Sequence, residues 1–270
     1  MVELENKYKI GVRRFGLINW VGAFSFYKKE VLRFIIVSGQ TLLGPILTSI
    51  LFLVVISLAI GDERKDVLGV PYIEFLANGL IMMQVIQQSF SHSSSSLMMS
   101  KMMGTIVDIV NSPLSAAEVT ISLVLASITR GLCIASISTL IFVLFLDLSI
   151  QNYFLWFLYL FLAGFFLGSA GTIAGLYADK FDQMATVTNF VIVPLSFLSG
   201  TFYSIEKLPD VLQSLSYYNP FFHMIDGFRY SFIGQSDGSI KFGIIFLLII
   251  SSITWYISYL LYRRGYKIKT

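Results

Sequence analysis

The stretch GQTLLGPILTSILFLVVISLAI, residues 39–60, contains no charged side chain. Folded as an α-helix it would be about 33 Å long, enough to cross the ~30 Å hydrocarbon core of a bilayer. Its apolar residues follow one another continuously, whereas the strands of a membrane β-barrel alternate apolar and polar residues. The stretch therefore predicts a transmembrane α-helix.

Similar apolar runs recur along the chain, and the composition agrees with them. Apolar residues make up 56% of the sequence and charged residues 13%, against about 25% charged residues in soluble domains. We predict six spans, near residues 39–60, 72–98, 116–146, 152–177, 185–203 and 241–262. The predicted fold class is all-α, a polytopic membrane protein. The net charge of +3 gives no reason to expect a nucleic-acid partner.

Lysine and arginine residues gather outside both ends of this membrane region. They are Lys7, Lys9, Arg13, Arg14, Lys28, Lys29 and Arg33 before the first span, and Arg263, Arg264, Lys267 and Lys269 after the last. Because such residues are retained on the cytoplasmic side, we expect the tails 1–19 and 263–270 to be cytoplasmic. Six spans then place the loops 61–71 and 204–240 outside, although 61–71 contains Arg64 and Lys65 beside three acids.

Residues 20–37 have the pattern of an amphipathic helix before the first span. One face carries Trp20, Phe24, Tyr27, Val31, Phe34 and Ile35, and Lys28, Lys29 and Arg33 occupy the other side. We expect this helix to lie in the cytoplasmic interface, with the aromatic rings at the lipid boundary and the cations toward headgroups. The alternative is a cytoplasmic extension of the first span.

The second predicted span is the most polar. Gln84, Gln88, His92 and Ser95 are spaced by four, four and three residues, so they share one helix face. Polar groups at membrane depth face protein or water rather than lipid. The stripe is therefore a candidate wall of a translocation path, and the alternative is hydrogen-bonded packing between helices. Arg130, inside the third span, either snorkels to the interface or pairs with Glu118.

Glycine and proline positions predict how other spans pack and bend. Gly164, Gly168, Gly171 and Gly175 form overlapping small-residue spacings in the fourth span. Such a face lets neighbouring helices approach closely. Pro45 and Pro194 lie inside the first and fifth spans, where proline can kink a helix.

The cytoplasmic segment SKMMGTIVDIVNSPLSAAEV, residues 100–119, predicts a short helix over 100–112 that ends before Pro113. Its apolar face consists of Met102, Met103, Ile106, Ile109 and Val110, and Lys101 lies off that face. Exposed methionines suit docking into a groove of a soluble partner, because their side chains adapt to its shape. Packing on the membrane surface is the alternative.

The external segment NPFFHMIDGFRY, residues 219–230, is unusually polar for this chain. Asn219 and Pro220 predict a turn that begins a helix. His223, Asp226 and Arg229 then follow at steps of three, on adjoining parts of one face. The spacing suggests an ion pair between Asp226 and Arg229, within the helix or across a dimer.

The sequence lacks the residues that several kinds of activity require. The sequence has no G-x-x-x-x-G-K-[ST] loop, so we do not expect the chain to hydrolyse ATP. Histidine, cysteine and acidic residues are too few and scattered for a metal site, and we expect no cofactor. Ser199 does not match the G-x-S-G motif of an intramembrane serine protease, because Phe197 occupies the position of its first glycine.

The stretch FLSGTFYSIEKLPDVLQSLSYYNPFFHMIDGFRYSFIG, residues 197–234, resembles the end signature of the type-2 permease family of ABC transporters. The matching residues are Gly200, Phe202, Tyr203, Leu208, Pro209, Asn219, Pro220 and Arg229. Together with the helix before the first span, the six spans and the short helix after the second, the resemblance covers nearly the whole chain after residue 20. It looks closest to the YadH-like branch of small bacterial permeases.

The resemblance implies a type-2 transmembrane domain over residues 20–267 in a bacterial inner membrane. Two permease copies would surround a central path, and two copies of a separate ATPase subunit would bind ATP beneath them. Residues 100–112 would be the coupling helix, 20–37 the interface helix, and 204–235 short helices that re-enter from outside, with His223 at the exit. The expected activity is export of a sugar polymer, lipid or amphipathic molecule. The alternative, an ATPase-independent secondary transporter, is disfavoured because we find neither paired repeats nor an acid deep in any span.

Overall fold

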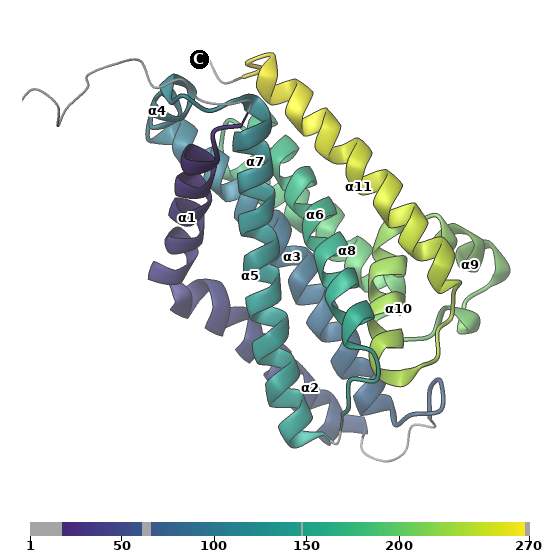
Figure 1. Cartoon of the computed structure of the whole chain (residues 1–270). Coiled ribbons are helices and arrows are strands. Elements are labelled where there is room, and N and C mark those ends of the chain that lie inside the picture. The colour runs from purple at the N-terminus through teal and green to yellow at the C-terminus, as the bar shows by residue number, and fades with distance from the viewer. Residues whose placement is uncertain (1–17, 61–65, 147, 268–270) are drawn as a thin grey trace, which may run out of the picture.

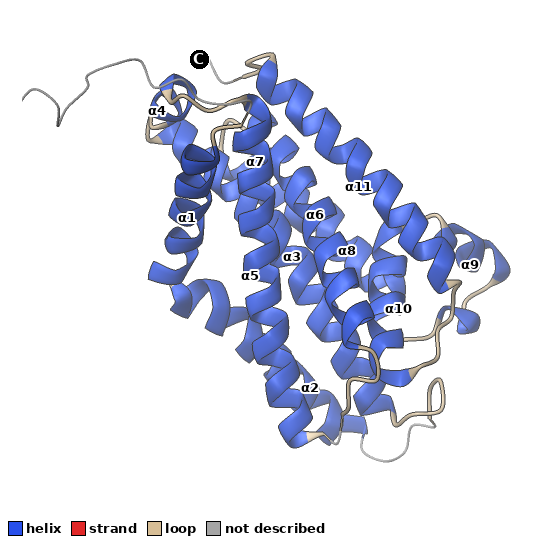
Figure 2. Ribbon diagram, in the orientation of Figure 1, coloured by secondary structure: helices blue, strands red, loops and turns tan. Residues whose placement is uncertain are grey.

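The computed structural model describes residues 18–60, 66–146 and 148–267. The predicted basic residues before position 18, Arg64, Lys65 and Lys269 lie outside these ranges. Within them every regular element is helical, as Figure 2 shows. The all-α prediction is therefore confirmed for the described part of the chain.

The helices follow one another with short connections (Figure 1). They are α1 (Trp20–Ile36), α2 (Gly44–Ile60), α3 (Tyr72–Met102), α4 (Ile106–Asn111), α5 (Ala116–Phe145), α6 (Tyr153–Tyr177), α7 (Phe181–Val187), α8 (Val193–Ser196), α9 (Asp210–Tyr217), α10 (Pro220–Ile233) and α11 (Ile240–Arg263). Between them lie the π-helical turns η1 (Gly39–Leu43), η3 (Thr188–Ile192) and η4 (Phe197–Thr201), and the 3₁₀ turn η5 (Ile205–Lys207).

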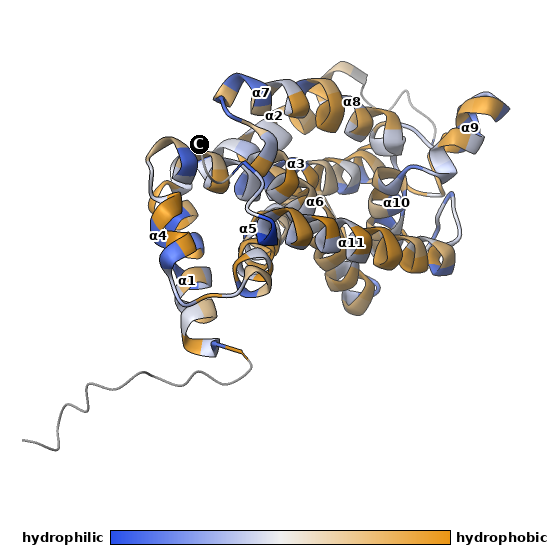
Figure 3. Cartoon of the chain, turned by 90° about the horizontal axis from the view of Figure 1, so that it is seen from above, coloured by the Kyte–Doolittle hydropathy of each residue, from blue (hydrophilic) through white to orange (hydrophobic). Residues whose placement is uncertain are grey.

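The long helix α3 is the centre of the bundle. It packs against α5 and α6 along its length and against α10 near its beginning, while α11 covers α6. Most of its side chains are buried. Figure 3 shows apolar residues on most of the helix surfaces around it, and both views place α9 at the margin of the bundle. The structure thus surrounds its most polar long helix with more apolar ones.

Five described helical segments are long and apolar enough to cross a membrane. They are Gly39–Ala59, Ala116–Phe145, Tyr153–Tyr177, Phe181–Thr201 and Ile240–Arg263. They match the first and the third to sixth predicted spans, within a few residues at each end. The helix for the predicted second span, α3, is present but too polar to be counted by hydropathy, and it extends to Met102 instead of ending at 98.

Irregular turns lie next to the two predicted kink sites. The π-turn η1 ends directly before Gly44 and Pro45, and η3 ends directly before Val193 and Pro194. Proline cannot donate the backbone hydrogen bond of a regular helix, and the turn before it widens in response. The segment of the fifth predicted span is therefore built from four short pieces rather than one continuous helix.

The glycines of α6 allow the close packing that was predicted. A Cβ at Gly164 or Gly168 would meet Ile128 or Ser127 of α5, and one at Gly171 or Gly175 would meet the carbonyl of Phe90 or Ser94 of α3. Two turns of α6 thus approach α5, and the next two approach α3. The small-residue face joins all three central helices.

We predict that Gly171→Ala destabilises the bundle, because the added methyl group overlaps backbone of α3 rather than a movable side-chain tip. Overpacking of this kind costs about 1–3 kcal/mol. Thermal unfolding of the detergent-solubilised protein should show a lower midpoint. Gly39→Ala is the matched control, since no atom lies within 4 Å of its added Cβ. Equal midpoints for the two variants would contradict the packing argument.

Candidate functional site

The interface between α1 and α3 holds a buried acid that the sequence analysis missed. Glu30 of α1 is fully buried. Its Oε2 accepts a hydrogen bond from Ser96 Oγ of α3 at 2.7 Å and one from Arg33 Nε at 3.1 Å. His92 Nε2 lies 3.9 Å from the same oxygen, and Lys29 Nζ lies 3.5 Å from Oε1. The carboxylate therefore joins α1 to the polar side of α3.

The α1 helix accordingly differs from its predicted division into one aromatic and one basic face. Phe34 is buried together with Phe26, which was not assigned to the apolar face, while Trp20, Phe24 and Ile35 are exposed. The apolar surface of α1 is thus divided between the bundle and the exterior. The only sequence signal for Glu30 was its i,i+3 spacing to Arg33, which also fits an ordinary surface pair.

Glu30, Ser96 and His92 form a polar layer between α1 and α3, and two arginines extend this layer toward α5. Arg33 Nη2 donates to the carbonyl of His92 at 3.0 Å. Arg130, nearly buried, donates to the side chain of Gln88 and to the carbonyl of Thr41 at 3.3 Å. The layer therefore connects α1, η1, α3 and α5 through charge-assisted hydrogen bonds, which are stronger than neutral ones.

Of the two alternatives given for Arg130, the pair with Glu118 is wrong. The Glu118 carboxylate accepts backbone N–H groups instead, from Asn19 at 2.5 Å and from Ser115 at 2.6 Å. Glu118 and Ser115 form a reciprocal capping box at the start of α5. Glu118 therefore caps the start of α5, and Arg130 donates to neutral acceptors instead.

The four predicted path residues have different surroundings. Gln84 and His92 are buried, while Gln88 and Ser95 are half-buried. Gln88 and His92 take part in the polar layer, and Ser95 Oγ donates to the carbonyl of His92 within its own helix at 3.2 Å. A role of this stripe in a translocation path stays a prediction.

Arg229 of α10 is the largest fully buried side chain at the other end of the molecule, with 1% of its surface exposed. Its guanidinium carbon lies 3.6 Å from the ring centroid of Phe75 in α3. Its Nη2 donates to the carbonyl of Gly200 at 2.8 Å. Gly200 has a φ of +79°, in the left-handed region that favours glycine, and it interrupts the helical backbone inside η4. Arg229 therefore fixes the chain where the fifth predicted span breaks off.

The ion pair predicted between Asp226 and Arg229 does not form within the helix, and pairing across a dimer stays a prediction. Asp226 accepts the backbone N–H groups of Asp237 at 2.9 Å and Gly238 at 3.0 Å, just before α11. Asp237 in turn accepts from Ser204 Oγ at 2.6 Å. Asp226 therefore organises the connection from α10 to α11, whereas Arg229 points toward α3 and η4.

The remaining signature residues shape the same external region. Asn219 caps α10 by accepting the N–H of Phe221, and Pro220 is its first residue, as predicted. His223 is buried among Phe222, Phe242 and Phe246, and its Nε2 lies 2.8 Å from the carbonyl of Tyr217. Three more signature residues are Phe202, Tyr203 and Pro209. Phe202 stacks on Phe197, Tyr203 donates to the carbonyl of Leu198, and Pro209 directly precedes α9. Re-entry of this region into the membrane and an exit role for His223 stay predictions.

At the opposite end, the predicted helix 100–112 is interrupted. The helix α3 continues to Met102, Gly104 adopts a φ of +73°, and α4 starts only at Ile106. Glycine at the turn allows the left-handed backbone that stops α3.

The predicted apolar face of this segment is divided in two. Ile106 and Ile109 are buried in a cluster with Phe26, Leu97 and Val119. Met102 and Met103 are 59% and 67% exposed, and Val107 and Val110 are exposed as well. We call Met102, Met103, Val107 and Val110 the apolar knuckle. Lys101 does not join it, because its side chain turns inward and is only 8% exposed.

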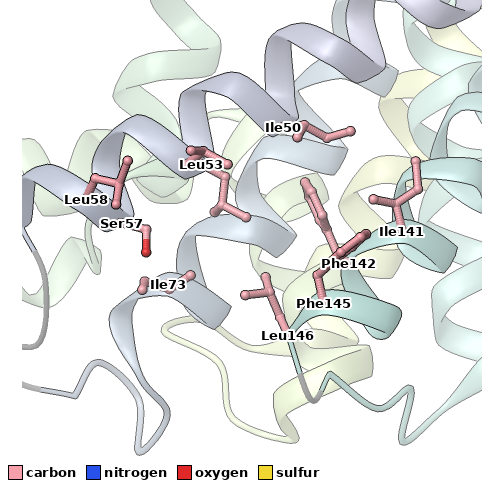
Figure 4. Close-up of a pocket in the computed structure, with 10 residues that line it drawn as sticks. Ile50, Leu53, Ser57, Leu58, Ile73, Ile141, Phe142, Phe145 and Leu146 are labelled. Carbon is pink, nitrogen blue, oxygen red and sulfur yellow. The ribbon is translucent and has the colours of Figure 1, made fainter.

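An apolar groove between α2, the start of α3 and the end of α5 has a volume of about 330 Å³ (Figure 4). Ser57 is the only polar side chain among its lining residues. Specific ligand sites combine an apolar lining with a few placed polar groups. We therefore do not propose this groove as a specific ligand-binding site.

Comparisons with known proteins point to one family. Residues 23–233 match the model of the family described as ABC-2 type transporter. The chain is 32% identical over 248 residues to the inner membrane transport permease YadH of Escherichia coli (strain K12), covering 91% of this chain and 96% of that protein. It is 24% identical over 265 residues to nodulation protein J of Neorhizobium galegae, covering 92% and 94%.

We predict that Glu30→Ala loosens α1 from α3, because Ser96 and Arg33 lose their common acceptor. Breaking a fully buried ion pair costs about 3–5 kcal/mol, and the partial exposure of Arg33 should reduce this. Hydrogen exchange should accelerate in residues 20–36. Lys29→Gln is the control, since its amine is half exposed and contacts the same carboxylate. Unchanged exchange in Glu30→Ala would show that the carboxylate does not hold α1.

We also predict that Arg229→Gln lowers the thermal unfolding midpoint and that Arg229→Lys recovers only part of the loss. Lysine can donate to the Gly200 carbonyl, but it lacks the flat guanidinium that stacks on Phe75 while donating. Such cation–π contacts contribute about 0.5–2 kcal/mol. A lysine variant as stable as the unmodified protein would argue against the stacking.

Proposed function

The chain belongs to the ABC-2 type transporter family, and we propose that it is the permease subunit of an ATP-driven exporter in a bacterial inner membrane. It is a multi-pass membrane protein with several apolar helices. In the proposed complex, two copies of the permease surround a path and a separate ATPase subunit binds each copy. Transport would alternate the access of the path between the two sides of the membrane.

We propose that α3 is the sixth span, in addition to the five apolar segments. Its 31 residues would extend about 46 Å, more than the hydrocarbon thickness. Its polar residues are covered by α1, α5 and α6 rather than facing lipid, which is how a polar helix is accommodated at membrane depth. Six spans would place both ends of the chain on the same side of the membrane. Because the ends are rich in lysine and arginine, that side would be the cytoplasmic one.

The observation that carries the proposal is the apolar knuckle at the end of α3. Its two exposed methionines lie on the side that this topology makes cytoplasmic, beyond the predicted end of the second span. A monomer gains nothing by exposing such flexible apolar side chains to water, whereas a partner's groove would bury them. Ile106 and Ile109 of the same segment are buried in the bundle, so a force applied to the knuckle would be passed to the helices packed against them.

The path is proposed along the half-buried polar face of α3, around Gln88 and Ser95, at the junction between two copies. A single copy leaves these groups partly accessible. The substrate class, a sugar polymer, lipid or amphipathic molecule, rests on the family alone.

A second candidate, an ATPase-independent carrier, gains one specific observation. Glu30 and His92 are both buried and lie 3.9 Å apart. Paired ionisable groups at membrane depth occur in proton-coupled carriers. However, Glu30 belongs to α1 rather than to one of the apolar segments, and two cationic side chains already neutralise it.

We predict that the chain co-purifies with an ABC ATPase subunit from its own genome, and that Met102→Asp with Met103→Asp strongly lowers the yield of that ATPase. Two carboxylates would have to be desolvated in the partner's groove. The measurement is quantitative pull-down after co-expression in native membranes, with size-exclusion profiles to check that each variant is folded. Met102→Leu with Met103→Leu is the matched control and should retain binding.

Equal recovery of the ATPase by the aspartate and leucine variants would place docking elsewhere. Failure of the unmodified chain to bind any such ATPase, together with proton-driven transport in vesicles lacking it, would favour the carrier.

A further inference from the structure

Lys101 makes an unusual set of contacts for a residue adjacent to an exposed knuckle. Its Nζ donates to the carbonyls of Leu176 at 2.8 Å and Ala178 at 2.6 Å, with a longer contact to that of Gly175 at 3.4 Å. These carbonyls end α6, where a cation is favoured by the unsatisfied acceptors and the helix dipole. The end of α3 is therefore clamped to the connection between α6 and α7.

A second contact, independent of charge, holds the same connection. Met98 of α3, Ala178 and Met184 of α7 are buried together in a small apolar cluster. Met98 lies one turn before Lys101, so the last turns of α3 contact both the α6–α7 connection and α7 itself. Movement of this end of α3 would have to carry the start of the fifth predicted span with it or break both contacts.

The segment that begins with α7 is an interrupted helix. It contains η3, the proline at 194 and η4, and Gly200 inside η4 has a left-handed backbone. Its far end is also attached to α3, because Tyr72 Oη donates to the carbonyl of Phe202 at 3.1 Å. A continuous helix is thus attached at both ends to an interrupted one, whose irregular turns are the usual places for a helix to bend.

We propose that Lys101 is a positioning residue for transport, which links the apolar knuckle to the start of the fifth predicted span. This proposal rests on the proposed function, because it takes the knuckle to be the point at which the ATPase acts. A displacement of the knuckle on ATP binding moves the end of α3. Lys101 transmits this displacement to the α6–α7 connection and to α7, and the irregular turns beyond absorb it.

The chain supplies a matched control on the same connection. Lys267 Nζ donates to the carbonyl of Tyr177 at 3.1 Å and to Asp179 Oδ2 at 2.8 Å, and this hydrogen bond lowers the pKa of the Asp179 carboxyl group. Lys267 is 39% exposed and contacts neither α3 nor α7 through these bonds. Asp179 is also the ion-pair partner of Lys101, with 3.8 Å between its Oδ1 and Lys101 Nζ. Removing Lys267 therefore perturbs the connection but leaves the contacts of Lys101 with the carbonyls of Leu176 and Ala178 in place.

The test measures two movements in the complex of permease and ATPase, in lipid nanodiscs and with Cys133 replaced by alanine. One spin label replaces exposed Asp108 in α4, beside the knuckle, and in a separate sample one replaces exposed Asp182 in α7. Each sample gives one distance between the two copies, measured with and without a non-hydrolysed ATP analogue. Both distances should shift in the unmodified complex and in Lys267→Gln.

In Lys101→Gln the shift at 108 should persist and the shift at 182 should fall by more than half, with the ATPase still bound. Lys101→Arg keeps the charge and the donors, so it should retain both shifts. A full shift at 182 in Lys101→Gln overturns the inference and leaves the proposed function intact. No ATPase bound, or no shift at 108 in the unmodified complex, overturns the proposed function and the inference with it.

If Lys101→Gln cannot be purified, Met184→Ala tests the same link from α7, because it opens the apolar half of the contact. The shift at 182 should again fall by more than half. A full shift in this variant would overturn the inference.

Discussion

The fold depends on burying one polar helix inside a mostly apolar bundle. Serine, glutamine and histidine side chains along α3 would be costly in contact with lipid, since nothing there accepts or donates hydrogen bonds. The glycines of α6 bring helix backbones close enough to exclude lipid from one side, and α1 and α5 supply Glu30, Arg33 and Arg130 on another. Every other helix can then present apolar residues outward.

The two ends of α3 are held by different kinds of interaction. Near its start, Phe75 stacks with Arg229 and Tyr72 binds the carbonyl of Phe202, so aromatic rings and backbone groups define the contact. At its end, Lys101 binds carbonyls at the end of α6. A continuous helix restrained at both ends resists bending, and the pieces α7, η3, α8 and η4 beside it are where bending costs least.

Composition and periodicity were sufficient for the helical class, for five of the six predicted spans and for the close packing of α6, because these depend on local, repeating features. Two of the failures involve competition between distant groups. The spacing of Asp226 and Arg229 suggested a pair. Instead, backbone N–H groups at 237 and 238 donate hydrogen bonds to the carboxylate, and the guanidinium stacks on the ring of Phe75. Similarly, the sequence did not single out Glu30, because only the fold brings Ser96 and His92 against it. The helix 100–112 failed for a local reason, since the left-handed turn at Gly104 was not recognised.

Stability alone does not explain the polar layer between α1 and α3. Burying ion pairs costs desolvation free energy, and apolar packing of the same volume is often at least as stable. What the charges add is a requirement for one register, because Glu30 can satisfy Ser96 and Arg33 together only when α1 lies at one height along α3. An apolar contact would tolerate sliding by a turn. The layer therefore makes α1 follow α3, while the glycine contacts of α6 provide closeness without such directional bonds. If a force on the knuckle displaces α3, α1 is constrained to move with α3. The backbone would then have to bend at the irregular turn η1, which joins α1 to α2.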